Sequence, residues 1–294
     1  MSDEILYCFD LADDSESFGL VPELLAGLEA DFSSYENREE GTFVHTVYAS
    51  TLPQAERNLA AVRARLPEWR SFGAELAAGS IYTLNKADWA EAWKKFFKPL
   101  EISDTLIVRP SWEKIEPKPG QAVLTIDPGM SFGTGQHATT LYCLQVIDRL
   151  AGREGMASML DAGCGSGILA IAAGLRGYRR IDAFDFDPDA VRVAKENIAV
   201  NSLTGICPVV GNAENYQGAP GGYDLVCANI LGHLLKAYSA NIATWVKPGK
   251  YLALAGILTA EFDGVSKVYT SLGFEELERA TLREWTSGLF RKKA

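Results

Sequence analysis

"LDAGCGSG", from Leu160 to Gly167, is the stretch from which we expect the fold to follow. It ends a short apolar run that is typical of a buried strand, and it opens an apolar helical segment, "GILAIAAGLRG". Its glycines, Gly163, Gly165 and Gly167, form the pattern G-x-G-x-G. Glycine allows a sharp turn and the close approach of a ligand, and the helix that follows offers free N–H groups. By itself, such a loop is only a weak indication of a binding site.

The chain around this loop alternates between strand and helix candidates from about Leu124 onward. The expected strands are "SMLDAG", "RIDAFDFD", "ICPVVGN", "YDLVCANI" and "YLALAGIL". The expected helices are "GILAIAAGLRG", "PDAVRVAKENIAVN", "GHLLKAYSANIATWV" and "EFDGVSKVYTSLG". Repeated β-α units predict an α/β fold with a mostly parallel sheet and helices on both faces. The last segment, "FEELERATLREWTSGLFRKK", is predicted to form an antiparallel hairpin.

The second strand candidate ends on an acidic residue that narrows the choice of ligand. Asp185 follows Gly163 by 22 residues, and a carboxylate at this place can accept hydrogen bonds from both hydroxyls of a ribose. Asp187 is the alternative, or it caps the next helix, in which Pro188 occupies the first position. The dinucleotide pattern needs a glycine where this chain has Ile168, so a pyrophosphate is disfavoured. A nucleoside without a pyrophosphate remains, and S-adenosylmethionine fits.

The third and fourth strand candidates end on asparagines. Asn212 in "GNAEN" could contact an adenine edge, although asparagine is also an ordinary turn residue. Asn229 in "CANILGHLL" is expected to face the cleft outside the strand ends, where its amide offers both an acceptor and a donor.

The N-terminal part is predicted to be a separate small α+β unit. Residues 1–85 show the order β-α-β-β-α-β, which is that of a ferredoxin-like module. Residues 86–99 are predicted to be a linker helix with one aromatic face, ended by Pro99. Residues 100–294 then form the larger domain.

Charge is distributed unevenly over these parts. Residues 1–60 hold thirteen acidic and two basic residues, a net charge of −11, whereas the remaining chain carries +1. Two interpretations are open: the acidic charge serves solubility alone, or it forms a docking face for a basic protein partner. An acidic face would repel nucleic acid, so we expect no direct nucleic-acid specificity.

Several classes of protein are disfavoured by composition. Five scattered cysteines without a C-x-x-C pair suit free thiols in a reducing compartment. Three separated histidines give no metal-binding pattern, so we expect no metal site. No apolar run reaches the ~20 residues of a membrane span, and the acidic N-terminus lacks the basic start of a signal peptide. We therefore expect a cytoplasmic protein without a membrane association.

Five segments together resemble one known family. "DPGMSFGTGQHATT", "DAGCGSGILAIAA", "FDFDPDAV", "ANIL" and the linker "DWAEAWKKFFKP…RPSW" are similar to those of the bacterial methyltransferases of ribosomal protein L11, the PrmA family. The resemblance covers essentially the whole chain, up to the closing "REW". It implies a seven-stranded class I (Rossmann-like) methyltransferase sheet preceded by a small substrate-recognition domain. It also implies methyl transfer from S-adenosylmethionine to lysine ε-amines and the N-terminal α-amine of L11.

The resemblance also implies roles for individual residues. Thr140, Gly163, Asp185 and Asn229 would contact the cofactor, and Phe132 would lie close to it. The loop "SFGTGQHATT" would then be a flap over the cofactor. His137 in this loop could be functional, but a local cap or loop contact explains it equally well.

Methyl transfer to an amine sets a requirement for the acceptor. A lysine has a pKa of about 10.4, so only about one in a thousand is neutral at pH 7, a handicap of roughly 4 to 5 kcal/mol. We expect Asn229 to accept a hydrogen bond from the incoming amine and see no obvious general base. Alternatives are lysines of another basic protein, a nucleic-acid amine, a nicotinamide-dependent oxidoreductase and a non-catalytic docking module. The stretch Asn229–Gly232 lacks the aromatic residue that would stack on a flipped base.

Overall fold

The computed structural model describes residues 5–13, 21, 25, 30–37, 42–71, 76–85, 97–127 and 137–294. The chain divides into two compact units, Met1–Phe96 and Phe97–Ala294. Of the expected linker helix, residues 86–96 lie outside the described residues, and residues 97–99 are not helical.

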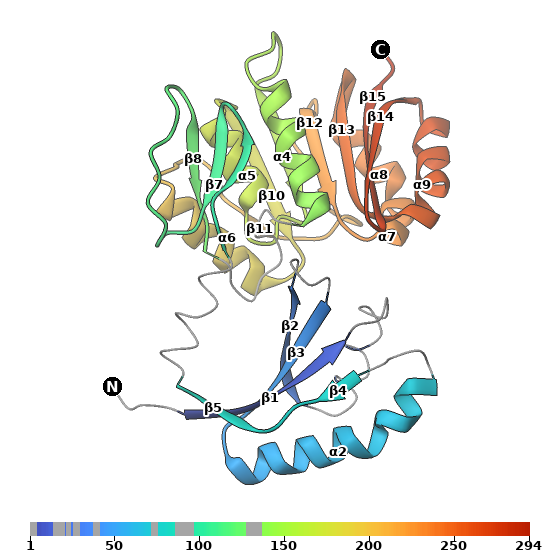
Figure 1. Ribbon diagram of the computed structural model, residues 1–294. Coiled ribbons are helices and arrows are strands. Elements are labelled where there is room, and N and C mark those ends of the chain that lie inside the picture. Colours follow the sequence, from blue (N-terminus) through green and yellow to red (C-terminus); the bar gives the residue numbers. More distant parts are fainter. Residues whose placement is uncertain are drawn as a thin grey trace. The chain divides into compact units, whose positions relative to one another are not determined.

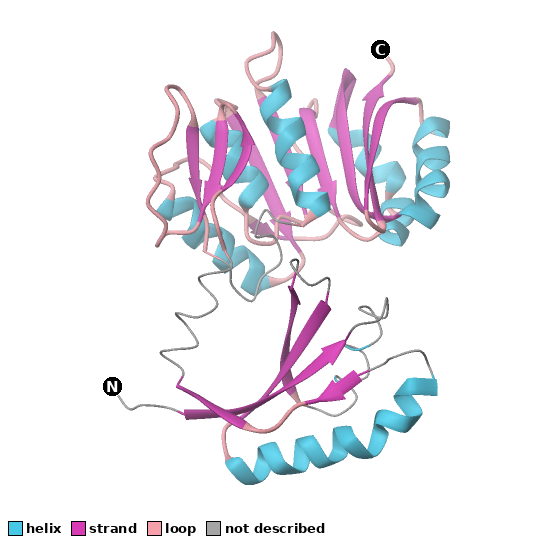
Figure 2. Cartoon of the chain, in the orientation of Figure 1, coloured by secondary structure: helices cyan, strands magenta, loops and turns pink. Residues whose placement is uncertain are grey.

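The N-terminal unit is an antiparallel sheet with a long helix on one face (Figures 1 and 2). Its elements are β1 (Ile5–Asp13), β2 (Asp31–Asn37), β3 (Thr42–Ala49), α2 (Leu52–Ser71), β4 (Leu76–Ala78) and β5 (Tyr82–Asn85). The strand order is β2-β3-β1-β4, and β5 also pairs with β1. The order β1, β2, β3, α2, β4 agrees with the predicted order β-α-β-β-α-β except at its first helix, because residues 14–29 are described only at Val21 and Leu25. Strand β5 was not expected.

The core of this unit follows the alternation of side chains along the strands. Phe9, Leu11 and Val47 are buried on one face of the sheet and pack against Leu59 and Val62 of α2. Burial of these side chains is what stabilises α2 on that face, since each contributes about 1.5 to 3 kcal/mol.

The C-terminal unit is built on a seven-stranded sheet with the order β11-β10-β9-β12-β13-β15-β14. The strands are β9 (Ser158–Ala162), β10 (Arg180–Asp185), β11 (Val209–Val210), β12 (Tyr223–Asn229), β13 (Val246–Leu258), β14 (Phe274–Leu282) and β15 (Trp285–Lys292). All of these strands are parallel except β15, which runs antiparallel to both neighbours. The predicted α/β class and the terminal antiparallel hairpin are confirmed.

Helices cover both faces of this sheet (Figure 2). They are α4 (Ala138–Leu150), α5 (Ile168–Leu175), α6 (Pro188–Val200), α7 (Gly232–Ala237), α8 (Ser239–Trp245) and α9 (Thr259–Ser271). Alternate residues of each strand point to two separate cores: Met159 lies with α4, α5 and α6, and Leu160 with α7, α8 and α9. The single helix predicted over residues 232–246 is in fact two short helices, α7 and α8.

A small three-stranded sheet precedes the large one and was not predicted. It consists of β6 (Leu100–Ser103), β7 (Leu106–Arg109) and β8 (Ala122–Thr125). Leu106, Val108 and Leu124 are buried and belong to the same core as α4 and α5. Strands of four residues show too few alternations for a sequence pattern to reveal them.

Candidate active site

The site lies where the order of the parallel strands reverses. From β9 the chain proceeds outward to β10 and β11, and then returns to the other side of β9 with β12. Crevices outside the carboxyl ends of strands at such a switch point are where open α/β sheets bind ligands. The glycine loop follows β9 at this point, and Asn229 ends β12 beside it.

The glycine loop needs its glycines for two reasons. Gly163, Gly165 and Gly167 all have positive φ, at 77°, 51° and 79°. A Cβ on Gly163 would lie 2.5 Å from Ile230 Cγ2, and one on Gly167 would lie 3.0 Å from Ala194 Cβ. A side chain at either position is therefore both strained and crowded.

Asp185 anchors this loop from the next strand. One carboxylate oxygen accepts from the Gly165 N–H at 2.8 Å, and the other accepts from the Asp187 N–H at 3.0 Å. The side chain is buried, yet each carboxylate oxygen can accept a further hydrogen bond. Asp187 instead caps α6, with its oxygen 2.9 Å from the Asp189 N–H and Pro188 at the start of the helix. Asp185 thus remains the better candidate for a ribose.

Asn229 and Thr140 meet although 89 residues separate them. The Asn229 amide nitrogen lies 3.4 Å from Thr140 Oγ1, which is a buried hydroxyl in the first turn of α4. The Asn229 oxygen is buried and has no hydrogen-bond partner among the described residues. A buried acceptor without a partner costs free energy unless a ligand supplies a donor.

Asp161 is a second unpaired acceptor, which the sequence analysis did not single out. Its side chain is fully buried. One oxygen accepts from the Ala170 N–H at 3.0 Å, while the other has no partner in the ranges that the structure describes. Burial raises the pKa of Asp161 to about 7, against the lowering effect of the Ala170 N–H. The signal available in the sequence was an acidic residue two positions before Gly163, inside an otherwise apolar strand.

The remaining predicted residues have local roles or are not described. The Asn212 oxygen accepts from the N–H groups of Glu214 and Asn215, both at 3.1 Å, which is the geometry of an asparagine turn. Phe132 lies outside the described residues. His137 is the N-cap of α4: its ring nitrogen accepts from the Thr139 N–H at 3.4 Å. The His137 ring also packs edge-on against Trp285, and burial lowers its pKa.

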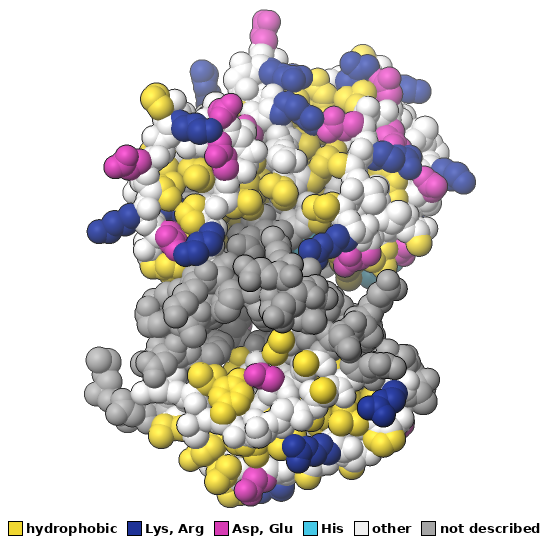
Figure 3. Space-filling model, in the orientation of Figure 1, with side chains coloured by type: hydrophobic (Ala, Val, Ile, Leu, Met, Phe, Trp, Pro, Cys, Tyr) yellow, Lys and Arg dark blue, Asp and Glu magenta, His cyan; other side chains and the backbone are white. Residues whose placement is uncertain are grey.

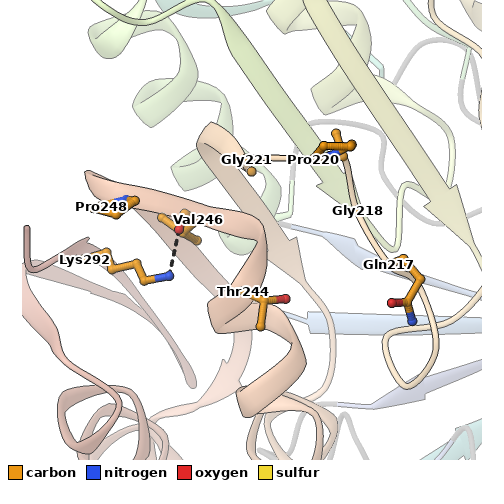
Figure 4. Close-up of a pocket in the computed structure, with 10 residues that line it drawn as sticks. Gln217, Gly218, Pro220, Gly221, Thr244, Val246, Pro248 and Lys292 are labelled. Carbon is orange, nitrogen blue, oxygen red and sulfur yellow. Dashed lines mark hydrogen bonds between the residues drawn. The ribbon is translucent and has the colours of Figure 1, made fainter.

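A cavity of about 500 Å³ lies at the opposite end of the strands, away from the glycine loop (Figure 4). Gly222 and Val246, at the amino ends of β12 and β13, line it together with Lys292. The Lys292 ammonium donates to the carbonyls of Ala243 and Val246, at 2.7 and 2.9 Å. This cavity is therefore separate from the switch point.

The described part of the chain contains neither a cluster of metal-binding side chains nor a membrane-spanning helix. No group of three or more histidine, cysteine, aspartate or glutamate side chains there could hold a metal ion. None of the helices described is long and apolar enough to cross a membrane.

The unpaired acceptors of the site show which hydrogen-bond donors a cofactor would have to supply. Asp161 and Asn229 each present a buried oxygen without a partner, and Asp185 can accept further hydroxyl hydrogens. These groups fit the amino-acid and ribose ends of S-adenosylmethionine, which carry N–H and O–H donors. An α/β sheet of this strand order, with antiparallel β15 and with this loop and these acceptors at its switch point, is typical of the class of S-adenosylmethionine-dependent methyltransferases, and S-adenosylmethionine is the cofactor.

Comparison with known proteins identifies the family within this class. The family described as ribosomal protein L11 methyltransferase (PrmA) matches residues 10–293, and the chain belongs to this family. A ribosomal protein L11 methyltransferase of Geobacter metallireducens is 37% identical over 284 residues, which are 92% of this chain and 93% of that protein. Another, from Geotalea uraniireducens, is 40% identical over 221 residues, 72% of this chain and 70% of its relative.

A solved structure agrees with this assignment. The ribosomal protein L11 methylase of Lactobacillus delbrueckii subsp. bulgaricus superimposes with a TM-score of 0.60 and 25% sequence identity. The match covers 67% of this chain and all of that one.

Proposed function

We propose that this protein transfers methyl groups from S-adenosylmethionine to ribosomal protein L11, at lysine ε-amines and at the N-terminal α-amine. The observation that carries this proposal is the unpaired oxygen of Asn229 at the switch point, held in place through Thr140. It is an acceptor of the kind that an incoming amine needs. The names of the relatives support L11 as the substrate.

The positions of the side chains support the following assignment of cofactor contacts. Gly163 and Gly165 leave room for the cofactor at the backbone, and Asp185 accepts the ribose hydroxyls. Thr140 and Asn229 lie at the methyl-donor end. We assign Phe132 to the covering loop and Asn212 to the adenine edge through its amide nitrogen.

The enzyme must bind the substrate amine in its neutral form and in line with the methyl carbon. When bound, S-adenosylmethionine supplies an electrophilic methyl group on a sulfonium. The ammonium of the substrate has to lose its proton to water first, and a buried surrounding favours its neutral form. Asn229 then orients the nitrogen through its carbonyl oxygen, so that positioning provides most of the rate enhancement.

The two units are assigned separate tasks. Residues 100–294 form the catalytic domain, whose seven-stranded order supports a class I methyltransferase sheet. Residues 1–85 form a ferredoxin-like recognition domain, supported by the order β2-β3-β1-β4, and residues 86–99 link the two. The acidic N-terminal domain recruits the basic substrate, and a ribosomal substrate places the enzyme in the cytoplasm.

The test is methylation of purified L11 with labelled cofactor, read by intact-protein and peptide mass spectrometry. We expect label on lysines and on the N-terminus, and none with the Asn229→Ala variant at matched protein concentration. Label on another basic protein together with unlabelled L11 would favour the alternative substrate. Binding of S-adenosylmethionine without any turnover would leave only a docking module.

A further inference from the structure

The N-terminal sheet has a second face that no described helix covers. The residues of its core, such as Phe9, Leu11 and Val47, all point to the α2 face. The residues that alternate with them along the same strands have their side chains on the opposite face. Cys8 lies there with a tyrosine opposite it on each side, Tyr48 on β3 and Tyr82 on β5.

Asp10 is the charged centre of this face. It lies two residues beyond Cys8, directly opposite Thr46. The hydroxyls of Thr46 and Tyr82 both donate to the same Asp10 oxygen, at 2.7 and 3.0 Å. The second oxygen accepts no hydrogen bond from any side chain or backbone group described. These two hydrogen bonds hold the carboxylate in one position.

The surroundings of Asp10 suit the side chain of a lysine or arginine. Asp31, directly opposite Tyr48, is exposed and adds a second carboxylate, and none of the described residues on this face is basic. Tyr82 is 37% exposed, and partly buried Leu6 and Leu84 form a cross-strand pair on the same face. A long basic side chain can lie along such apolar surface, with its charge on the carboxylate and next to aromatic rings.

We infer that this face, centred on Asp10 and flanked by Tyr48 and Tyr82, binds a lysine- or arginine-bearing segment of the basic substrate protein. The inference rests on the proposed function and locates the docking within the N-terminal unit. Charge complementarity is the reason for this choice of occupant, because Asp10 and Asp31 put two carboxylates on this face, and the first sixty residues together carry a net charge of −11. By contrast, basic and acidic side chains are interspersed over the visible face of the C-terminal unit (Figure 3).

The first test compares two variants of the full chain that each remove one negative charge. Asp10→Asn keeps an acceptor for Thr46 and Tyr82 but loses the charge. Glu56→Gln removes an exposed charge from α2, the helix on the other face. We expect Asp10→Asn to raise the KM for L11 about tenfold, the effect of losing one well-placed charge pair, with kcat unchanged. Glu56→Gln should match the wild type, and a rise of equal size in both variants overturns the inference.

A second measurement does not depend on a variant. Hydroxyl-radical footprinting of the wild-type protein should show Tyr82 protected when L11 is added and not when S-adenosylmethionine is added alone. Unchanged labelling of Tyr82 at saturating L11 overturns the inference even if the enzyme methylates L11. If wild-type protein neither binds nor methylates L11, the proposed function itself has failed.

Discussion

At the scale of single residues, the site depends on carboxylates and amides whose partners are backbone N–H groups. The Asp185 carboxylate accepts from the N–H groups of Gly165 and Asp187, so that the side chain that we propose for the ribose also shapes the loop. Asp187, two residues away, carries out the separate task of capping α6. The two residues therefore make a matched pair for mutation.

Asp185→Ala should weaken the binding of S-adenosylmethionine by about 1.5 to 3 kcal/mol, since charged hydrogen bonds to the ribose are lost. Asp187→Ala should leave affinity nearly unchanged and lower stability by about 1 kcal/mol, as expected for a lost helix cap. Titration calorimetry and thermal unfolding measure the two quantities. If Asp187→Ala instead weakened binding and Asp185→Ala left affinity unchanged, Asp187 would be the residue that binds the ribose.

Asn229→Ala should reduce turnover far more than it reduces the melting temperature. The Asn229 oxygen accepts no hydrogen bond from the described part of the chain, so its removal should cost the fold little but remove the acceptor for the amine. Single-turnover methylation of L11 at saturating cofactor isolates this step. Wild-type rates in that assay would exclude the proposed orienting role.

At the scale of the elements, an ion pair between a buried carboxylate and a partly exposed lysine holds the amino ends of three strands together. Asp224 on β12 accepts from the N–H groups of Ala157 and Ser158, before and at the start of β9. Lys247 on β13 donates to the same carboxylate at 2.9 Å. This cluster lies at the opposite end of the sheet from the glycine loop, so its role is in stability.

Asp224→Asn should lower the free energy of unfolding by about 2 to 3 kcal/mol at pH 7, because a buried lysine-paired carboxylate is lost. Burial alone would raise the pKa of Asp224, but Lys247 and the N–H donors outweigh it and lower the pKa. A lowered pKa stabilises the fold above the unfolded value of about 3.9 and loses that effect as the pH falls through the folded value.

Urea unfolding of wild type and Asp224→Asn between pH 7 and pH 3 measures this dependence. The difference between the two proteins should be constant down to about pH 4 and shrink below it. Lys250→Met is the control, because Lys250 lies 3.9 Å from the carboxylate and should matter less. A difference that grows on acidification would contradict the assignment.

At the scale of the whole molecule, the excess negative charge and the candidate cofactor site belong to different units. The acidic excess lies within residues 1–60, and every described site residue lies after residue 136. The division between Phe96 and Phe97 offers a boundary for separating the two.

A protein comprising residues 97–294 should bind S-adenosylmethionine with the affinity of the full chain and lose most of its activity on intact L11. The kcat/KM of the full chain should fall with added salt, because opposite charges steer the encounter and salt screens them. The truncated protein should respond less to salt. Equal kcat/KM for both proteins, or a full-length activity that ignores salt, would reduce the acidic charge to a solubility feature.

Local patterns in the sequence determined the elements of this protein and the type of its ligand. The alternation of strands and helices after Leu124, the glycines of the loop and the acidic residue ending β10 are each contained within a few residues. Hydrophobic periodicity and backbone preference act at that range, so the α/β class and the position of the loop could be predicted. The four-residue strands β6 to β8 were missed because they are too short to show a period.

Only the tertiary structure decided which distant side chains meet. Asn229 reaches Thr140 across 89 residues, and Asp10 reaches Thr46 and Tyr82 across 36 and 72. The burial of Asp161, which raises its pKa, likewise comes from helices packed on both faces of its strand. Such contacts depend on strand order and on helix packing, which bring remote segments together, and no periodicity within one segment encodes them.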